Sequence, residues 1–282
     1  MRESIILGAL LASFANSQQT VLKGDTASAK CHALVLSGGS NNGAWEAGVI
    51  WGLLHYGDPS EFAWDVISGV SAGAINTGGA AVWATGDEYD MTEWLSGKWA
   101  EMTNDQVYQE WPEGVWAVLK EQSALDSSPA VNTLTEIVNE IGEIKRNFVV
   151  SAVDANSGVY VPWTNENTTI ESLPQAVMSS ASIPFVFPPQ HMDGYVLMDG
   201  GSVWNINIPT AINYCLDQGF AEEDIILDVA ICGYSSKTEG SVKKNALMNY
   251  RMAQDEAAYF HGGNAAASSR RAYPDVDQRF YF

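Results

Sequence analysis

The sequence predicts an α/β fold with a mainly parallel central sheet that is covered by helices on both faces. Short apolar runs rich in β-branched residues, typical of buried strands, alternate with longer segments of helical periodicity. Connections of this length allow right-handed crossovers, which place successive strands parallel in one sheet. The expected strands are residues 32–37, 64–68, 147–153, 159–163, 195–198 and 224–231. The expected helices are residues 43–56, 72–85, 113–122, 129–141, 169–179, 209–217 and 242–260.

The N-terminus has the layout of a signal peptide. Arg2 precedes the apolar run 5–14, and small residues up to Ser17 offer a cleavage site. We expect residues 1–17 to be removed and the protein to be secreted or lumenal in the secretory pathway, with a buried N-terminal helix as the alternative. No other run of about 20 apolar residues occurs, so we expect no transmembrane segment in the mature chain.

The rest of the chain is expected to form one main domain and a C-terminal extension. The chain has 282 residues, which is near the upper size of a single compact domain. We place the main domain at residues 32–235 and a C-terminal helix and tail at residues 236–282. The tail from residue 265 onwards carries no functional motif, and we expect it to be partly disordered.

The charge and cysteine content exclude several classes of function. Acidic residues number 34 against 14 basic ones, a formal net charge of −20 that repels nucleic acids and anionic bilayers. No C-x-x-C pair or His/Cys cluster occurs, so we expect no metal. The cysteines Cys31, Cys215 and Cys232 allow one disulfide and one free thiol, and their pairing is open. We expect Cys232 to be a buried strand residue.

The most informative motif is Gly69-Val70-Ser71-Ala72-Gly73. It follows the expected strand 64–68 and opens the expected helix 72–85, as in a nucleophile elbow. The flanking glycines Gly69 and Gly73 allow a sharp turn, so that the Ser71 hydroxyl stands clear of the backbone. Taken alone, the pentapeptide is also compatible with an ordinary glycine-rich turn.

Two further segments place this motif in context. Upstream, the loop Gly38-Gly39-Ser40-Asn41-Asn42-Gly43 joins an expected strand to an expected helix. Downstream, residues 179–189 read S-S-A-S-I-P-F-V-F-P-P, followed by Asp199-Gly200-Gly201 and Asn207-Ile208-Pro209. In this order the motifs resemble those of the patatin-like phospholipase family over roughly residues 32–235.

The resemblance implies a lipid acyl hydrolase that works through an acyl-serine intermediate, needs no cofactor, and meets its lipid at a membrane or micelle surface. It also implies that Ser71 and Asp199 form a catalytic dyad, and that the amides of Gly38, Gly39 and Ser40 form the oxyanion hole. The residues themselves agree with this, because a serine needs a base and Asp199 ends an apolar run. We therefore expect Asp199 at the carboxyl edge of the parallel sheet. The supporting motif residues are Asn42, Gly43, Gly69, Gly73, Gly200 and Gly201.

The glycine loop departs from the family pattern G-G-G-x-[Arg/Lys]-G. The third glycine is replaced by Ser40, and the basic residue is replaced by Asn42. A cation would add positive potential beside an oxyanion, whereas an amide offers only a dipole. We expect lower or altered activity rather than none.

Three alternatives remain open at this point. The chain order Ser71, Asp199, His261 matches the Ser-Asp-His triad of α/β-hydrolases, which would make the protein a triad esterase. The altered loop also fits a weakly active or inactive patatin-like binding or storage protein. A nucleotide phosphate site at the glycine loop is disfavoured, because the full spaced glycine fingerprint is absent.

Residues 86–128 are less regular and rich in tryptophan. The four indoles could anchor a helical cap or form an amphipathic surface that meets lipid, and we favour packing because indole rings are usually at least partly buried. These residues are Trp94, Trp99, Trp111 and Trp116.

Overall fold

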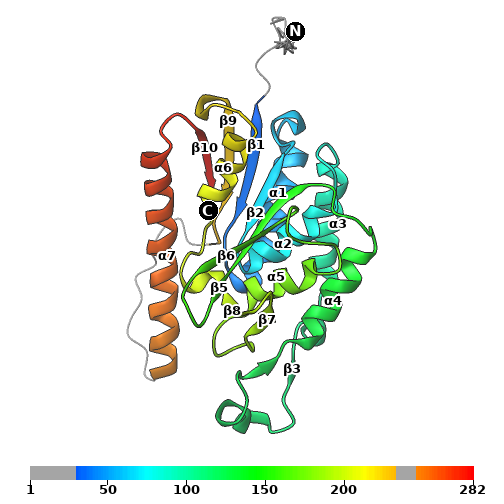
Figure 1. Cartoon of the computed structure of the whole chain (residues 1–282), viewed down its shortest axis with the longest axis vertical. Helices are drawn as coiled ribbons and strands as arrows, with labels where there is room; N and C mark the ends of the chain where they lie inside the picture. The colour runs from blue at the N-terminus through cyan, green and yellow to red at the C-terminus, as the bar shows by residue number, and fades with distance from the viewer. Residues whose placement is uncertain (1–29, 233–245) are drawn as a thin grey trace, which may run out of the picture.

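A computed structural model describes residues 30–232 and 246–282, so the expected signal peptide lies outside the described residues. Its centre is a mixed, mostly parallel eight-stranded sheet in the order β10-β9-β1-β2-β5-β8-β7, with β6 paired to β5 (Figure 1). The strands of this sheet are β1 (Cys31–Leu36), β2 (Val66–Gly69), β5 (Asn147–Asp154), β6 (Tyr160–Thr164), β7 (Gln190–Met192), β8 (Tyr195–Asp199), β9 (Ile225–Ala230) and β10 (Asp277–Tyr281). This confirms the predicted fold class.

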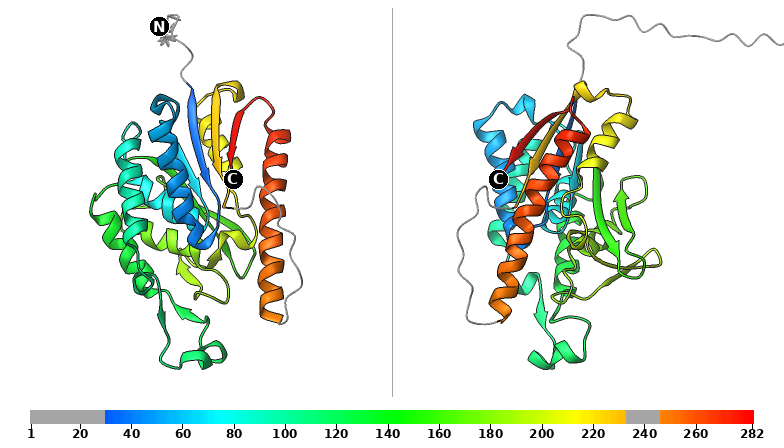
Figure 2. Two further views of the ribbon diagram at one scale, coloured as in Figure 1. Left: turned by 180° about the vertical axis from the view of Figure 1, so that it is seen from behind. Right: turned by 90° about the vertical axis from the view of Figure 1, so that its left-hand side faces the viewer.

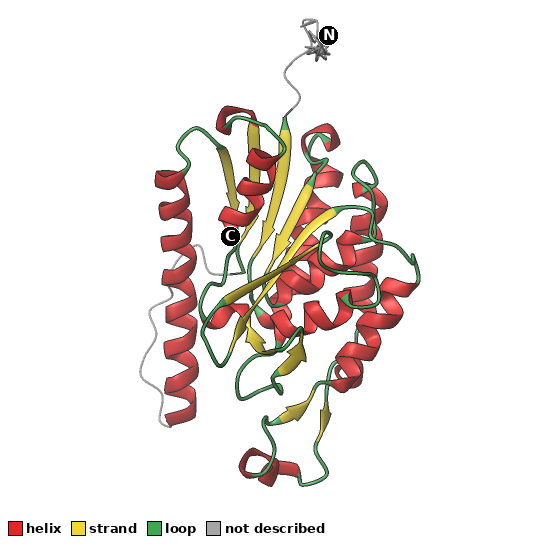
Figure 3. Cartoon of the chain, in the orientation of Figure 1, coloured by secondary structure: helices red, strands yellow, loops and turns green. Residues whose placement is uncertain are grey.

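Helices cover both faces of the sheet, as the view turned by 90° shows (Figure 2), and Figure 3 distinguishes helices from strands by colour. The α-helices are α1 (Gly43–Tyr56), α2 (Ala72–Ala81), α3 (Glu88–Glu101), α4 (Ser128–Asn139), α5 (Leu173–Ala181), α6 (Ile208–Asp217) and α7 (Ala246–Ala272). Side-chain alternation along β1 explains the two layers. Ala33 and Val35 pack in one cluster with α6, whereas Leu34 and Leu36 pack in another with α1 and α3.

The sheet changes direction beside β5. The pairs β10–β9, β9–β1, β1–β2 and β2–β5 are parallel, so these strands all run toward the same edge. Strands β6 and β8 pair with β5 antiparallel, and β7 pairs with β8 antiparallel. The turn from β2 into α2, which contains Ser71, therefore lies at the edge where the parallel strands end.

Sequence analysis was wrong at two places outside this core. Helix α3 was missed, because residues 86–128 show too little periodicity, and the expected helix 113–122 is a short 3₁₀ helix, η4 (Gly114–Leu119). The tail is ordered, since α7 continues to Ala272 and β10 then extends the sheet (Figure 2).

A buried carboxylate explains why the tail folds back onto the sheet. Asp228 of β9 is fully buried and accepts hydrogen bonds from Trp64 Nε1 at 2.8 Å, Arg279 Nη2 at 2.7 Å and Tyr281 Oη at 2.9 Å. A buried charge is costly unless it is paired and hydrogen-bonded. Strand β10 supplies two of the three donors, so its docking satisfies Asp228.

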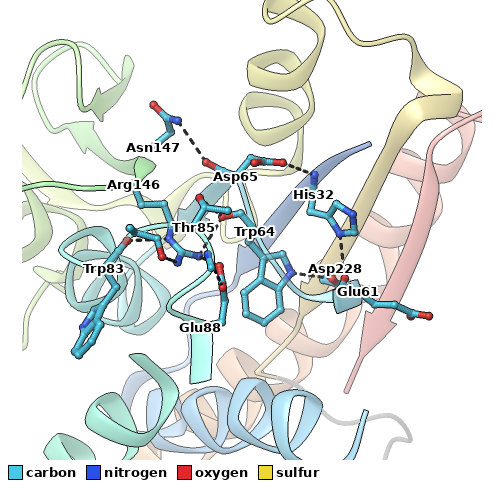
Figure 4. Close-up of polar contacts among 12 residues, drawn as sticks. His32, Glu61, Trp64, Asp65, Trp83, Thr85, Glu88, Arg146, Asn147 and Asp228 are labelled. Carbon is cyan, nitrogen blue, oxygen red and sulfur yellow. Dashed lines mark hydrogen bonds and ion pairs between the residues drawn. The ribbon is translucent and has the colours of Figure 1, made fainter. Parts of the chain in front are cut away.

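A second polar brace joins the start of β5 to α3, as Figure 4 shows. The guanidinium of Arg146 donates to the carbonyl oxygens of Trp64 and Trp83 and forms an ion pair with Glu88 at 2.7 Å. These contacts lie at the edge of the sheet opposite Ser71. The Arg146 side chain binds backbone carbonyl oxygens and pairs with Glu88, which indicates a structural role for this residue.

One disulfide connects the start of β1 to α6. It joins Cys31 and Cys215, which are 184 residues apart in the chain, while Cys232 is a free thiol. Cross-linking such distant residues restricts the unfolded chain strongly, and disulfides typically contribute about 3 kcal/mol.

We predict that reduction lowers the free energy of unfolding by about 3 kcal/mol, measured by urea denaturation with and without reductant. Because reduction opens only the Cys31–Cys215 bond, a Cys232→Ala variant should show the same loss. An unchanged urea midpoint on reduction would contradict this prediction.

Candidate active site

The turn between β2 and α2 holds Ser71 in a strained backbone conformation. Its φ is +56° and its ψ is −119°, a region that non-glycine residues rarely adopt. The neighbouring glycines are required by close approach. A Cβ on Gly69 would lie 2.1 Å from the carbonyl oxygen of Gly73, and one on Gly73 would lie 2.4 Å from that of Leu36. This is the geometry of a nucleophile elbow, which sharply exposes the middle residue of the turn.

Helix α5 braces this strained turn. The backbone N–H of Ser71 donates to Ser180 Oγ at 3.0 Å, and Ser180 Oγ donates to the carbonyl oxygen of Ser151 at 2.6 Å. Ser180 is fully buried, so its hydroxyl is held between the elbow and β5. Sequence analysis quoted this serine as part of a motif but gave it no role.

Asp199 reaches the same edge by a different route from the one expected. We expected a parallel strand, but β8 runs antiparallel to β5, with Asp199 opposite Ala152. Strand β8 begins beyond the edge and runs back toward it, so its last residue arrives beside the elbow. The expected location is therefore right, but the reason given for it is wrong.

The Asp199 carboxylate is buried, and the Ser71 side chain is close enough to lower its pKa. Both residues are 5% exposed, and Asp199 Oδ1 accepts the Gly201 N–H at 2.7 Å. Burial raises the pKa of Asp199 to about 6, because desolvation disfavours the charged form, while the hydrogen bonds from the Ser71 side chain and the Gly201 amide oppose that rise. A carboxylate with this pKa is ionised at neutral pH and is basic enough to accept a proton.

The glycine loop lies against the elbow. A Cβ on Gly38 would lie 2.1 Å from Asn205 Oδ1 and 3.0 Å from the Cβ of Ser71, so a larger residue would displace these neighbours. Asn205 anchors the loop from the other side. Its Nδ2 donates to the Gly38 carbonyl at 2.9 Å, and its own carbonyl accepts the Gly38 N–H at 3.1 Å. Asn205 follows the D-G-G turn that carries Asp199, and sequence analysis missed it.

The loop then forms a short 3₁₀ helix, η1 (Ser40–Asn42), before α1 begins at Gly43. Ser40 has a φ of +55°, a conformation that favours glycine. The family pattern has glycine at this position, so the serine takes up backbone strain where the family has none. Asn42 is exposed, and its carbonyl oxygen lies 3.4 Å from the Cys232 sulfur.

A cavity of about 540 Å³ opens at Ser71. Its walls come from α2, α3, α4, α5 and the segment between α3 and α4, and most of them are apolar. The side chains that line it include Ile75, Trp99, Met102, Val107, Leu125, Leu134, Met178, Ile183, Val186 and Phe187. Its volume and apolar walls are those of a small-molecule site, and Ser71 and Ser40 are among the polar residues that line it.

A comparison of the sequence with models of known protein families shows which family the chain belongs to. The model of the patatin-like phospholipase family matches residues 34–212, more than half of the chain. The chain belongs to the patatin-like phospholipase family. Membership confirms the resemblance found in the sequence. No curated protein matches the chain significantly.

Among solved structures, this patatin-like phospholipase is similar to VipD from Legionella pneumophila, with 15% identity and a TM-score of 0.42. The alignment covers 86% of this chain and 56% of VipD. The patatin-like chain therefore spans a little over half the length of that structure.

Beneath the glycine loop of this patatin-like phospholipase lies a buried acid that sequence analysis missed. Glu46 of α1 is fully buried and accepts a hydrogen bond from Asn76 Nδ2 at 3.2 Å and a long one from Ser37 Oγ at 3.5 Å. Burial raises the pKa of Glu46 to about 8, because desolvation outweighs these hydrogen bonds. Its position one turn into an otherwise apolar helix was the available indication.

Cys232 lies next to this acid rather than inside a strand. Strand β9 ends at Ala230, and Cys232 is half-buried against the loop, where a Cβ on Gly39 would lie 2.7 Å from its sulfur. Burial, together with the neighbouring Glu46, raises the pKa of the thiol. The expectation of a buried strand residue is therefore wrong, although the thiol is not an activated one.

The structure gives no support to the other polar candidates. His261 is exposed on α7, and it is not among the partners of the Asp199 carboxylate.

No group of three potential metal ligands occurs within residues 30–232 and 246–282. None of the helices described there combines the length and apolar character needed to cross a bilayer.

Proposed function

We propose that the protein is a serine-dependent lipid acyl hydrolase in which Ser71 is the nucleophile and Asp199 is its general base. One observation carries this proposal. The Ser71 side chain, which lines an apolar cavity, interacts with the buried carboxylate of Asp199, whose pKa burial raises to about 6. A serine hydroxyl at neutral pH needs such a base before it can attack an ester.

The dyad would act in two steps. Asp199 accepts the hydroxyl proton while Ser71 Oγ attacks the ester carbonyl, and the departing alcohol then takes that proton, leaving an acyl-serine. Water, deprotonated by Asp199, attacks the acyl-serine and releases the fatty acid, and the proton returns to Ser71. Neither step requires a metal or a cofactor.

The glycine loop would stabilise the oxyanion formed in both steps. The amide of Gly38 is already bonded to the carbonyl of Asn205, so we assign this role to the amides of Gly39 and Ser40. Removing one oxyanion donor typically costs about 3 kcal/mol of transition-state stabilisation. The apolar cavity beside Ser71 would hold the acyl chain.

We also propose that the protein works in the secretory pathway or outside the cell. The signal-peptide layout of residues 1–17 supports this in the sequence. The disulfide between Cys31 and Cys215 supports it independently, because disulfides persist mainly in oxidising compartments.

A fluorophosphonate probe tests the proposed nucleophile. We expect covalent labelling of the purified protein, with the adduct located on Ser71 by peptide mass spectrometry. The Ser71→Ala variant should not be labelled, whereas Ser202→Ala, which removes another hydroxyl near the D-G-G turn, should be labelled normally. Labelling elsewhere, or none with a folded protein, would overturn the mechanism.

A weakly active binding protein is the second candidate, and the altered loop favours it. Asn42 stands where the family pattern has Arg or Lys, so the oxyanion lacks a nearby cation. We predict that Asn42→Arg raises turnover of a lipid ester about tenfold, since charge-assisted hydrogen bonds are roughly twice as strong as neutral ones.

The control for this prediction is Asn139→Arg, which adds the same charge at an exposed position on α4. Turnover should be compared on a panel of lipid esters for both variants. Unchanged turnover and lipid preference in Asn42→Arg would show that the missing cation does not limit this enzyme.

A further inference from the structure

The segment between α3 and α4 forms an arm that extends from the body of the protein. The arm consists of residues 104–126 and contains η3 (Asn104–Gln106), β3 (Gln109–Glu110), η4 (Gly114–Leu119) and β4 (Leu125–Asp126), with β3 and β4 paired as a small hairpin. In Figure 1 it is the lowest part of the molecule, at the end of the sheet toward which β1 and β2 run. The arm therefore projects from the edge that carries Ser71.

The tip of this arm exposes large apolar side chains. Trp116 is 66% exposed and Leu119 is 77% exposed, both on η4, and Val118 beside them is also exposed. Most tryptophans of folded proteins are substantially buried, and exposed apolar clusters commonly mark interaction surfaces. Two roles were considered for the tryptophans of residues 86–128, packing inside the protein and contact with lipid. Trp99 packs as a wall of the cavity, whereas Trp116 is exposed and available for contact with lipid.

Phe185 is a further exposed apolar side chain, on the body of the protein near the base of the arm. It is 70% exposed and has a positive φ of +72°, which is costly for an aromatic residue. Its carbonyl oxygen accepts the N–H of Ala124 at 2.8 Å, and the next carbonyl, of Val186, accepts the N–H of Leu125 at 3.0 Å. These bonds fix Phe185 beside the base of the arm.

The base of the arm borders the cavity. Leu125 and Val186, which form the junction between the arm and the body, both line the cavity that opens at Ser71. A lipid surface held at the tip of the arm would therefore lie on the same side of the molecule as the entrance to the cavity. Such an arrangement suits an enzyme whose substrate resides in an aggregate rather than in solution.

The charges of the arm indicate which kind of lipid surface it can approach. Its only basic residue is Lys120, against the five acidic residues Asp105, Glu110, Glu113, Glu121 and Asp126. The whole chain has a net charge of −20. An anionic lipid surface would be repelled by such a segment, whereas an electrically neutral one would not.

We propose that the tip of the arm, Trp116 to Leu119, together with Phe185, docks onto the surface of zwitterionic lipid and delivers lipid to the cavity. This inference rests on the proposed lipid hydrolase function and adds the docking surface and the lipid class. Indole and leucine side chains suit the membrane interface, where an apolar body is buried and a polar edge stays hydrated.

The test uses the full chain and the double variant Trp116→Ser/Leu119→Ser. We expect the wild type to co-sediment with phosphatidylcholine vesicles and the variant to bind at least about tenfold more weakly. Replacing part of the phosphatidylcholine by phosphatidylserine should weaken wild-type binding. The matched control, Tyr56→Ser/Tyr89→Ser, removes two exposed aromatic residues away from the arm and should bind like the wild type.

Two readouts separate this proposal from the proposed mechanism. The arm variant should keep normal fluorophosphonate labelling and normal turnover of a short, water-soluble ester, and should lose activity only on vesicles. Ser71→Ala should keep vesicle binding. A wild-type protein that binds vesicles through the arm but shows neither fluorophosphonate labelling at Ser71 nor turnover would overturn the mechanism alone.

Three results would overturn the docking surface. They are wild-type vesicle binding by the arm variant, tighter binding of the wild type to anionic vesicles, and a dimer in analytical ultracentrifugation that the arm substitutions convert to a monomer without changing vesicle binding. The last result would make the tip an interface between two copies of the chain.

Discussion

Replacing Asp199 with asparagine should lower kcat/KM for lipid esters by about 10²- to 10⁴-fold, the range that a positioned general base contributes. The substitution keeps the shape of the side chain and an oxygen that can accept the Gly201 N–H, which now binds Asp199 Oδ1 at 2.7 Å. It removes the negative charge that enables the side chain to take the Ser71 proton. The loss should therefore appear in turnover more than in folding.

The pH dependence of the wild type gives an independent check. The pKa of Asp199 is raised from 3.8 to about 6, and the mechanism requires the ionised carboxylate. The value of kcat/KM should therefore be constant above pH 7 and fall tenfold per unit as the pH drops below about 6. A profile that stays flat down to pH 5 would contradict the assignment of Asp199 as the base.

Stability measurements can distinguish a chemical defect from an unfolded variant. Because the pKa of Asp199 is raised in the folded state, its ionisation opposes folding, and this cost grows as the pH rises from 3.8 to about 6. Asparagine does not ionise, so Asp199→Asn should be at least as stable as the wild type at pH 8. The control for activity is Asp217→Asn at the exposed end of α6, which should leave both turnover and stability unchanged.

The sequence predicted the part of the fold in which local pattern and tertiary structure agree. Helix α1 was predicted at residues 43–56 and is found there, because its start coincides with the glycine loop and its end with Gly57. Strands β1, β2, β5 and β9 are mostly apolar and almost entirely buried on both faces, as expected for a sheet covered by helices on both sides.

What the sequence did not predict depends on contacts between distant segments. Strand β10 forms because Asp228 needs the donors that Arg279 and Tyr281 supply, and no local pattern contains that need. The direction of β8 is set by its pairing with β5, so an apolar run ending in aspartate could not reveal it. The role of Asn205 likewise exists only because the chain brings it against Gly38.

The motifs of the candidate site could be recognised in the sequence because they depend on local steric constraints and not on contacts between distant segments. A nucleophile elbow requires small residues at fixed positions, since a Cβ on Gly69 or Gly73 would collide with backbone atoms. Such constraints require glycine at fixed positions, and these glycines can be recognised in the sequence. Glu46 left no comparable trace, because its importance comes only from being buried.

Replacing Glu46 with glutamine should remove a large pH dependence of stability. The acid is fully buried beneath the glycine loop, and burial raises its pKa from 4.5 to about 8. Between these two values the folded protein holds a proton that the unfolded chain has released, so the stability of the wild type falls as the pH rises. The cost is absent below pH 4.5 and complete above pH 8.

The size of the effect follows from the shift. One pKa unit corresponds to about 1.4 kcal/mol, so going from pH 5 to pH 8.5 should cost the wild type about 4 kcal/mol through Glu46. Glutamine can accept from Asn76 through its oxygen and donate to Ser37 Oγ through its amide group, without carrying a charge. The melting temperature of Glu46→Gln relative to the wild type should therefore rise by about 10 °C over this range.

The measurement is thermal unfolding of both proteins at a series of pH values. Asp199 contributes a cost of the same sign in both proteins, so it cancels in the difference. Glu136→Gln, at an exposed position on α4, is the matched control and should show no pH-dependent difference. If Glu46→Gln and the wild type keep a constant difference in melting temperature from pH 5 to pH 8.5, Glu46 is not a neutral acid in the folded protein. The glycine loop would then lie over a buried carboxylate, and the electrostatic potential at the oxyanion site would be more negative than it is beside a neutral Glu46.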